Sequence, residues 1–439
     1  MSPTLHREEV WYFLSNLNTM LGGVQIPPVF RVKQRFLNTV VQNVGNTLRL
    51  QLEQHAPPIH EGDRIAITCG SRGLDRYPDI VRTVVNYIIQ RGGQPFLLPA
   101  MGSHGGATSQ GQRELLARLG ITEQSMGVPM LSSMDTVQVG TAENGQPIYI
   151  NRYAAEADGI VLLNRIKPHT SFRGAYESGL VKMMAIGLAN QRGAEAAHGL
   201  RYENMANNIA AIGRAALQKL NIVCAVASIE NGYGKVAELH VLHPNEVLSR
   251  EPALLQRAFH LMPRIYLDEI DALVVSEIGK DISGTGMDTN IVGRFHTIAA
   301  SGGPRVSKLG LLDLSLRSDG NANGMGLADF VTKKLFQKID FAPTYMNSLT
   351  STEPNSTKLP MVLENDRLVV QACLKLCGQL DTYRSRLVFI RNTKNLNYVY
   401  MSGAAVGAIC PGADVEVDEV ETDVHFDTSG NLRLFDLPS

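Results

Sequence analysis

The chain has 439 residues, 44% of them hydrophobic and 19% charged, which is too long for one compact domain and typical of a folded protein with two or three cores. Its 41 basic and 42 acidic residues balance to a net charge of -1, so the composition offers no broad attraction to nucleic acid. The five cysteines are scattered and form no C-x-x-C pair, and no apolar run is long enough for a signal peptide or a membrane span. These features predict a cytoplasmic protein with no membrane partner.

Strand and helix patterns begin after a mixed segment of about 60 residues, which we expect to form a cover or an edge. The first half then predicts alternating elements: strands over 64–68, 95–99, 159–163 and 222–228, and helices over 78–90 and from a cap at 108 or 109 to 120. The alternation restarts near residue 263. It predicts strands over 271–275, 309–314 and 386–390, and helices over 326–339 and 366–377.

This order predicts an α/β fold of two α/β domains with mostly parallel sheets and an active site in the cleft between them. We expect residues 1–265 to form an N-terminal catalytic, cofactor-binding domain and residues 266–412 a smaller C-terminal domain. Residues 413–439 are expected to be a tail that returns to the first domain.

Three polar residues follow directly after predicted strands of the first domain. Arg72 lies in TCGSRG, His104 in AMGSHGG and His169 in NRIKPHT. Parallel strands present their carboxyl ends at one sheet edge, so these side chains are expected to share that edge. Each of them alone is more often an ordinary turn residue than a catalyst, and the three together leave several enzyme classes open.

Two further residues follow in ESGLVKMMAIGLANQRGAEAAHG. Lys182 stands among Val181, Met183 and Met184, and a lysine in apolar surroundings tends toward a lowered pKa, which makes it a nucleophile. His198 follows 16 residues later. The alternatives are a lysine that extends to the surface and a solvated histidine at a helix end.

The order Ser-Arg, Gly-Ser-His-Gly, Pro-His, Ser-Gly-x-x-Lys and His resembles the nickel-pincer-dependent lactate racemase family over about residues 60–210. The 32-residue interval between Arg72 and His104 agrees with that family. The resemblance implies an isomerase, a racemase or epimerase of a 2-hydroxy acid, that works by hydride transfer through a 2-keto acid. It also implies a nickel-pincer nucleotide cofactor, supplied by cofactor biosynthesis enzymes.

Carried over residue by residue, the resemblance implies covalent attachment of that cofactor at Lys182 and a nickel ligand at His198. His104 and His169 resemble the two acid/base histidines, Arg72 the arginine that holds the substrate carboxylate, and Ser71 with Arg72 part of the cofactor site. Imidazole suits both proton transfer near neutral pH and nickel binding. An arginine can hold a carboxylate with two hydrogen bonds.

The chain departs from the lactate-acting members at three places, so we expect another 2-hydroxy acid. His169 and Lys182 are 13 positions apart, Cys69 stands where an acid is expected, and the second domain carries GKDISGTGMDTNIVGR. Extra polar groups in that segment suit a larger substrate, polyhydroxylated or with a second carboxylate. The candidate substrate-binding residues there are Lys280, Asp288, Asn290 and Arg294. The alternative for them is a solvated turn with local Asx hydrogen bonds.

Two other functions remain open at this point. A zinc hydrolase could use His104, His169 and His198, although no H-E-x-x-H motif is present. A non-catalytic nickel or pincer carrier would not need both His104 and His169. An NAD-dependent oxidoreductase is disfavoured because no G-x-G-x-x-G follows a strand in a βαβ context.

Overall fold

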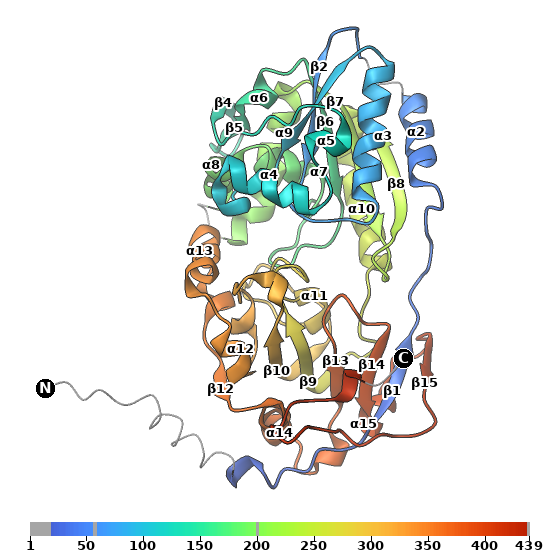
Figure 1. The fold of residues 1–439 in the computed structure, drawn as a ribbon, viewed down its shortest axis with the longest axis vertical. Helices are drawn as coiled ribbons and strands as arrows, with labels where there is room; N and C mark the ends of the chain where they lie inside the picture. Colours follow the sequence, from blue (N-terminus) through green and yellow to red (C-terminus); the bar gives the residue numbers. More distant parts are fainter. Residues whose placement is uncertain (1–18, 56–58, 199–201, 437–439) are drawn as a thin grey trace, which may run out of the picture. The chain divides into compact units, whose positions relative to one another are not determined.

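The computed structural model describes residues 19–55, 59–198 and 202–436. The chain divides into two compact units. We call residues 37–262 the first unit, and residues 263–439 with residues 1–36 the second unit. Each unit is built from helices and one large, mostly parallel sheet (Figure 1). The α/β class with mostly parallel sheets is therefore confirmed.

The sheet of the first unit has five strands in the order β3-β2-β6-β7-β8. All neighbours pair in parallel except β7 and β8. The strands are β2 (Arg64–Cys69), β3 (Gln94–Pro99), β6 (Gly159–Arg165), β7 (Ile222–Glu230) and β8 (Val236–Leu242). A separate hairpin consists of β4 (Thr136–Thr141) and β5 (Pro147–Asn151).

The helices of the first unit follow the predicted rhythm. They are α2 (Val44–His55), α3 (Tyr77–Gln90), α4 (Ser109–Arg118), α5 (Glu123–Met126), α6 (Arg152–Ala155), α7 (Leu180–Lys182), α8 (Asn190–His198), α9 (Met205–Lys219) and α10 (Val247–Leu261). A π-helical turn (Met183–Gly187) continues α7. The predicted helices over 78–90 and after 108 are confirmed as α3 and α4. The side chain of Thr108 caps α4 by accepting a hydrogen bond from the N–H of Gly111.

The apolar residues of these elements form one core. The apolar face of α3 includes Ile80, Val81, Val84 and Val85, and all four side chains are fully buried. The same core contains Ile65 and Ile67 from β2. Burial of both the strand and the amphipathic helix face explains why the hydrophobic spacing predicted these elements.

The sheet of the second unit has eight strands in the order β12-β11-β10-β9-β13-β14-β1-β15. Pairing is parallel from β12 to β13 and antiparallel from β13 to β15. The strands are β1 (Val29–Gln34), β9 (Glu269–Ile278), β10 (Arg305–Leu314), β11 (Phe330–Thr332), β12 (Met361–Leu363), β13 (Leu387–Ile390), β14 (Tyr398–Ser402) and β15 (Val415–Val417). The helices are α11 (Thr289–Val292), α12 (Lys333–Gln337), α13 (Phe341–Ser351), α14 (Asp366–Leu376) and α15 (Gly403–Val406).

The domain division differs from the prediction at both ends of the chain. β1 lies between β14 and β15 and pairs with both. This part of the segment expected to form a cover or an edge in the first domain is therefore an inner strand of the second unit. β15 belongs to the tail, so the tail joins the sheet of the second unit and does not return to the first domain. Hydrogen bonding between distant strands decides both placements, and local patterns carry no signal for it.

The single helix predicted over 326–339 is wrong. Residues Phe330–Thr332 form β11, a buried strand between β10 and β12, and only Lys333–Gln337 are helical, as α12. The side chain of Thr332 accepts a hydrogen bond from the N–H of Leu335 and so begins α12 directly after the strand. Three strand residues are too few to show a period of two in the sequence.

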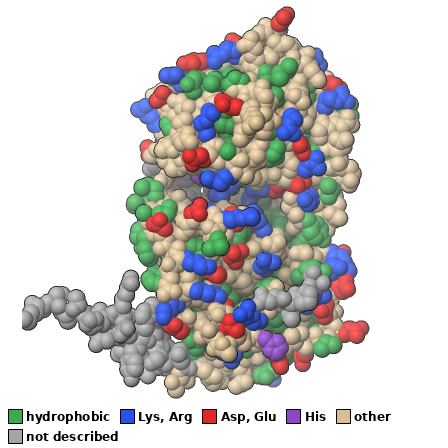
Figure 2. Space-filling view, in the orientation of Figure 1, with side chains coloured by type: hydrophobic (Ala, Val, Ile, Leu, Met, Phe, Trp, Pro, Cys, Tyr) green, Lys and Arg blue, Asp and Glu red, His purple; other side chains and the backbone are tan. Residues whose placement is uncertain are grey.

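The helix α13 carries an exposed apolar stripe. Figure 2 shows hydrophobic side chains gathered there. The residues of that stripe are Phe341, Tyr345, Met346 and Leu349, and the side chain of Leu349 is 74% exposed. Among the described residues, no helix has both the length and the apolar character needed to cross a membrane.

Candidate functional site

Three loops leave the same edge of the first unit's sheet. β2 pairs in parallel with β3 on one side and with β6 on the other, so the carboxyl ends of the three strands are neighbours. Ser71 and Arg72 follow β2, His104 follows β3, and His169 follows β6. The topology thus brings together the residues that the sequence predicted at separate strand ends.

The first of these loops contacts the second through Ser71 and His104. The hydroxyl of Ser71 is hydrogen bonded to Nδ1 of His104, and the His104 side chain is exposed. Gln112, fully buried on α4, donates from Nε2 to the carbonyl oxygens of Gly102 (3.1 Å) and His104 (3.4 Å). Gln112 therefore fixes the backbone that presents His104, a role for which the sequence has no recognisable signal.

Lys182 lies next to His169. Its Nζ is 2.6 Å from Nε2 of the imidazole and 5.7 Å from the centre of the Phe172 ring. Burial, first, and then the positive charges of Arg72 and Lys167 lower the pKa of Lys182 to about 7, although the Glu177 carboxylate acts in the opposite direction. At neutral pH a large share of this amine is therefore uncharged and nucleophilic.

The loop after β6 holds His169 by several contacts. Its N–H donates to Oε2 of Glu177 (2.6 Å), and its Nδ1 accepts from the N–H of Ser171 (3.0 Å). The ring lies against Phe172, with 4.3 Å between centroids. Glu177 is buried, which raises its pKa. Glu177 is a residue of this site that the sequence did not predict, although it lies between the two predicted residues His169 and Lys182.

Arg72 adds fixed positive charge to this edge. Burial and the neighbouring charge of Arg165 lower its pKa to about 10, so the guanidinium stays protonated at neutral pH. Arg165, at the end of β6, is itself paired with Glu230. With Lys167 close by, the strand ends can hold an anion such as a carboxylate or a phosphate.

His198 is the last residue of α8, and its side chain lies outside the described part of the structure. Its role as a nickel ligand stays a prediction. Within the described residues, no three His, Cys, Asp or Glu side chains are grouped as a metal site formed by the chain alone would need.

The candidate substrate residues of the second unit make local contacts. Nζ of Lys280 donates to the carbonyl oxygen of Gly284 (2.7 Å). Asp288 caps α11 and accepts hydrogen bonds from both the backbone N–H and the side-chain amide of Asn290. Asp288 and Asn290 are buried, so local Asx bonding is present but the turn is not solvated there.

Arg294 has a structural role in the second unit. Its guanidinium donates to the carbonyl oxygens of Val306, Ser307 and Leu327 and pairs with Asp329 at 2.8 Å. These contacts tie the segment after α11 to β10 and to the residues before β11. The predicted contact of Arg294 with a substrate stays a prediction.

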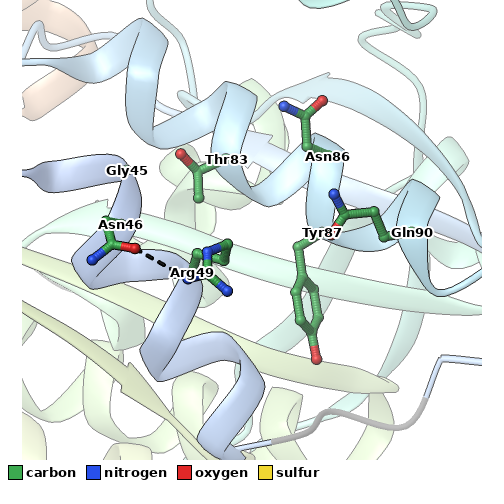
Figure 3. Close-up of a pocket in the computed structure, with 7 residues that line it drawn as sticks. All are labelled: Gly45, Asn46, Arg49, Thr83, Asn86, Tyr87 and Gln90. Carbon is green, nitrogen blue, oxygen red and sulfur yellow. Dashed lines mark hydrogen bonds between the residues drawn. The ribbon is translucent and has the colours of Figure 1, made fainter.

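A cavity of about 330 Å³ lies between α2 and α3 (Figure 3). It contains none of the predicted site residues. Its lining residues are Gly45, Asn46, Arg49, Thr83, Asn86, Tyr87 and Gln90.

Comparisons with known proteins find a similarity within the first unit. A search of curated proteins finds no match. Among solved structures, the lactate racemase apoprotein from Thermoanaerobacterium thermosaccharolyticum aligns with 84% of this chain and 89% of its own, at 14% identity and a TM-score of 0.42. The family model of the lactate racemase N-terminal domain matches residues 57–210, which contain Ser71, Arg72, His104, His169 and Lys182. Residues 57–210 of the first unit are thus similar to the N-terminal domain of lactate racemases.

Proposed function

We propose that the protein is a racemase or epimerase of a 2-hydroxy acid that uses a nickel-pincer nucleotide and proceeds through a 2-keto acid. The observation that carries the proposal is the pair formed by Lys182 and His169 beside the charge of Arg72. All three residues lie in the part of the chain that matches the lactate racemase N-terminal domain, which supports racemase chemistry in general.

The described residues fit such a cofactor. Lys182 supplies an amine with a lowered pKa, as covalent attachment to an electrophilic carbon requires. Arg72, Arg165 and Lys167 supply positive charge for a nucleotide phosphate or a substrate carboxylate. We propose His198 as the protein ligand of nickel, because imidazole suits that metal.

The chain's own residues have two tasks in the proposed reaction, which are to hold the substrate and to move its hydroxyl proton. Arg72 binds the substrate carboxylate and keeps the α-carbon in one place throughout. His104 and His169 exchange a proton with the substrate hydroxyl, one for each enantiomer, because the two enantiomers direct their hydroxyls to different sides. When bound, the cofactor supplies a hydride acceptor for the α-hydrogen, and that chemistry belongs to the cofactor.

For the substrate we propose a 2-hydroxy acid other than lactate, with further hydroxyls or a second carboxylate. The proposal rests on the segment between His169 and Lys182, where Arg173 and Glu177 add two charged side chains next to the site. In the second unit, Lys280, Asp288 and Asn290 remain candidates for contact with such a substrate.

The test is co-expression with the pincer biosynthesis enzymes, followed by intact-protein mass spectrometry, metal analysis and a screen of 2-hydroxy acids in deuterated water. We expect an added mass, bound nickel and interconversion of stereoisomers without solvent deuterium at the α-carbon. Zinc without a chromophore would favour a hydrolase instead. Bound nickel without turnover of any 2-hydroxy acid would favour a carrier.

A further inference from the structure

The backbone around His169 selects one form of its imidazole. Nδ1 accepts a hydrogen bond from the N–H of Ser171 at 3.0 Å, so this nitrogen carries no proton. An imidazolium has protons on both nitrogens and would direct one of them at that N–H. The ring is therefore neutral, and its single proton is on Nε2.

The proton on Nε2 decides the form of Lys182. Nε2 is 2.6 Å from Nζ, within hydrogen-bond range. An ammonium group has only donor hydrogens, so it would face the Nε2–H donor without an acceptor between them. A neutral amine has a lone pair that accepts this hydrogen bond.

We infer that His169, with its tautomer selected by Ser171, holds Lys182 as a free amine by donating Nε2–H to the lysine lone pair. His169 is then a positioning residue for the lysine in the chain before any cofactor is attached. The inference rests on the proposed function only in naming what the amine is prepared for, which is attachment to an electrophilic carbon.

The other groups that face Lys182 agree with this form. Arg72 and Lys167 are positive and disfavour an ammonium, while the carboxylate of Glu177 favours it. Glu177 is engaged with the N–H groups of His169 and Gly174 and with Arg173. Burial and the two positive charges outweigh the effect of Glu177, so the pKa of Lys182 is about 7.

The same geometry separates two roles of His169, holding Lys182 as a free amine and exchanging a proton with the substrate. For Nε2 to take a proton from a substrate hydroxyl, the imidazole must move its own proton to Nδ1, and the contact with Ser171 must open. Attachment at Lys182 removes the lysine lone pair that accepts from Nε2–H. His169 therefore serves the lysine first and becomes available to the substrate once the lysine is occupied.

The test uses the full chain without cofactor or nickel. Trace labelling with acetic anhydride is followed across pH by mass spectrometry of the peptide that contains Lys182. In the wild type, we expect labelling to rise with a midpoint near pH 7. In His169→Ala the midpoint should rise by at least about one unit, which lowers the free-amine fraction, and with it the labelling at pH 7, by about fivefold. His240→Ala, which removes a histidine paired with Glu238, should match the wild type.

An unchanged midpoint in His169→Ala would overturn the inference, because burial and Arg72 alone would then account for the amine. If that variant does not fold, nitrogen NMR of the wild-type imidazole decides the matter, and a proton on Nδ1 would equally overturn it. Neither measurement needs the cofactor, so either failure leaves the proposed racemase untouched. Conversely, an inactive matured enzyme with the expected labelling midpoint counts against the racemase alone.

Discussion

Oε2 of Glu251 accepts a hydrogen bond from the N–H of Val181 at 3.0 Å, one residue before Lys182. The same oxygen accepts from the N–H of Leu180, also at 3.0 Å. Glu251 lies on α10 and is 1% exposed. Its other carboxyl oxygen, Oε1, has no hydrogen-bond partner among the described residues. A buried carboxyl group thus anchors the start of the helical segment that presents the lysine.

The first prediction concerns stability against pH. Burial raises the pKa of Glu251 to about 7, above its ordinary value of 4.5, so the folded chain binds its proton more tightly than the unfolded chain. The protonated carboxyl group of Glu251 therefore contributes its full stabilisation of the folded chain below about pH 4.5, and this contribution is lost as the pH rises through 7. Glu251→Gln keeps an acceptor oxygen without this titration. Relative to wild type, the variant should gain up to about 3 kcal/mol of unfolding free energy between pH 4.5 and pH 8.

Urea unfolding of both proteins at the two pH values measures this difference. Other groups titrate in both proteins and cancel in the comparison. A wild type that loses no stability relative to Glu251→Gln over this range would show that the carboxyl is not held protonated.

The second prediction concerns the backbone beside His104. Gly105 and Gly106 both have positive φ angles, 67° and 66°. A Cβ on Gly105 would lie 2.6 Å from the backbone nitrogen of Gln112, whereas a Cβ on Gly106 meets nothing within 4 Å. Gly105→Ala should therefore destabilise the protein by about 1–3 kcal/mol more than Gly106→Ala, since only the first pays both the strain and the clash. Equal unfolding free energies for the two variants would contradict the close approach.

The third prediction concerns attachment. After maturation by the pincer biosynthesis enzymes, the peptide containing Lys182 should carry an added mass, because this lysine has the lowered pKa. Lys182→Ala should lose that mass, and Lys219→Ala, which removes an exposed lysine at the end of α9, should keep it. Peptide mass spectrometry decides, and an unmodified Lys182 in active, nickel-loaded enzyme would refute covalent attachment.

The fourth prediction concerns nickel. If His198 is the protein ligand, His198→Ala should lose nickel and activity while its circular dichroism stays that of the wild type. His240→Ala serves as the control and should retain the metal. Full nickel occupancy in His198→Ala would remove this histidine from the site.

The fifth prediction concerns the two acid/base histidines. His104→Ala and His169→Ala should each lower racemisation by about 10²- to 10⁴-fold, since a turnover needs one group to take the hydroxyl proton and another to return it. In a single turnover, the two variants should oxidise opposite enantiomers. Ready entry of solvent deuterium at the α-carbon would show that the α-hydrogen moves as a proton, which would contradict the hydride mechanism.

The sequence by itself determined the local elements of the first unit and the residues at their ends. Buried runs such as Ile65–Ile67 and the apolar spacing of α3 follow from burial on one face, which leaves a period in the sequence. The parallel topology predicted from this order of elements places Arg72, His104 and His169 at one edge of the sheet.

Only the tertiary structure decided which distant segments meet. β1 pairs with β14 and β15, and Glu251 on α10 accepts hydrogen bonds from the N–H groups of Leu180 and Val181. Buried backbone N–H groups need acceptors, and the fold decides which distant segment supplies them. The contact between Lys182 and His169, and the use of Arg294 within the second unit, likewise depend on side-chain packing across loops. Sequence spacing reports which residues share a face of one element, and it carries no information on which side chains of separate elements come within hydrogen-bond distance.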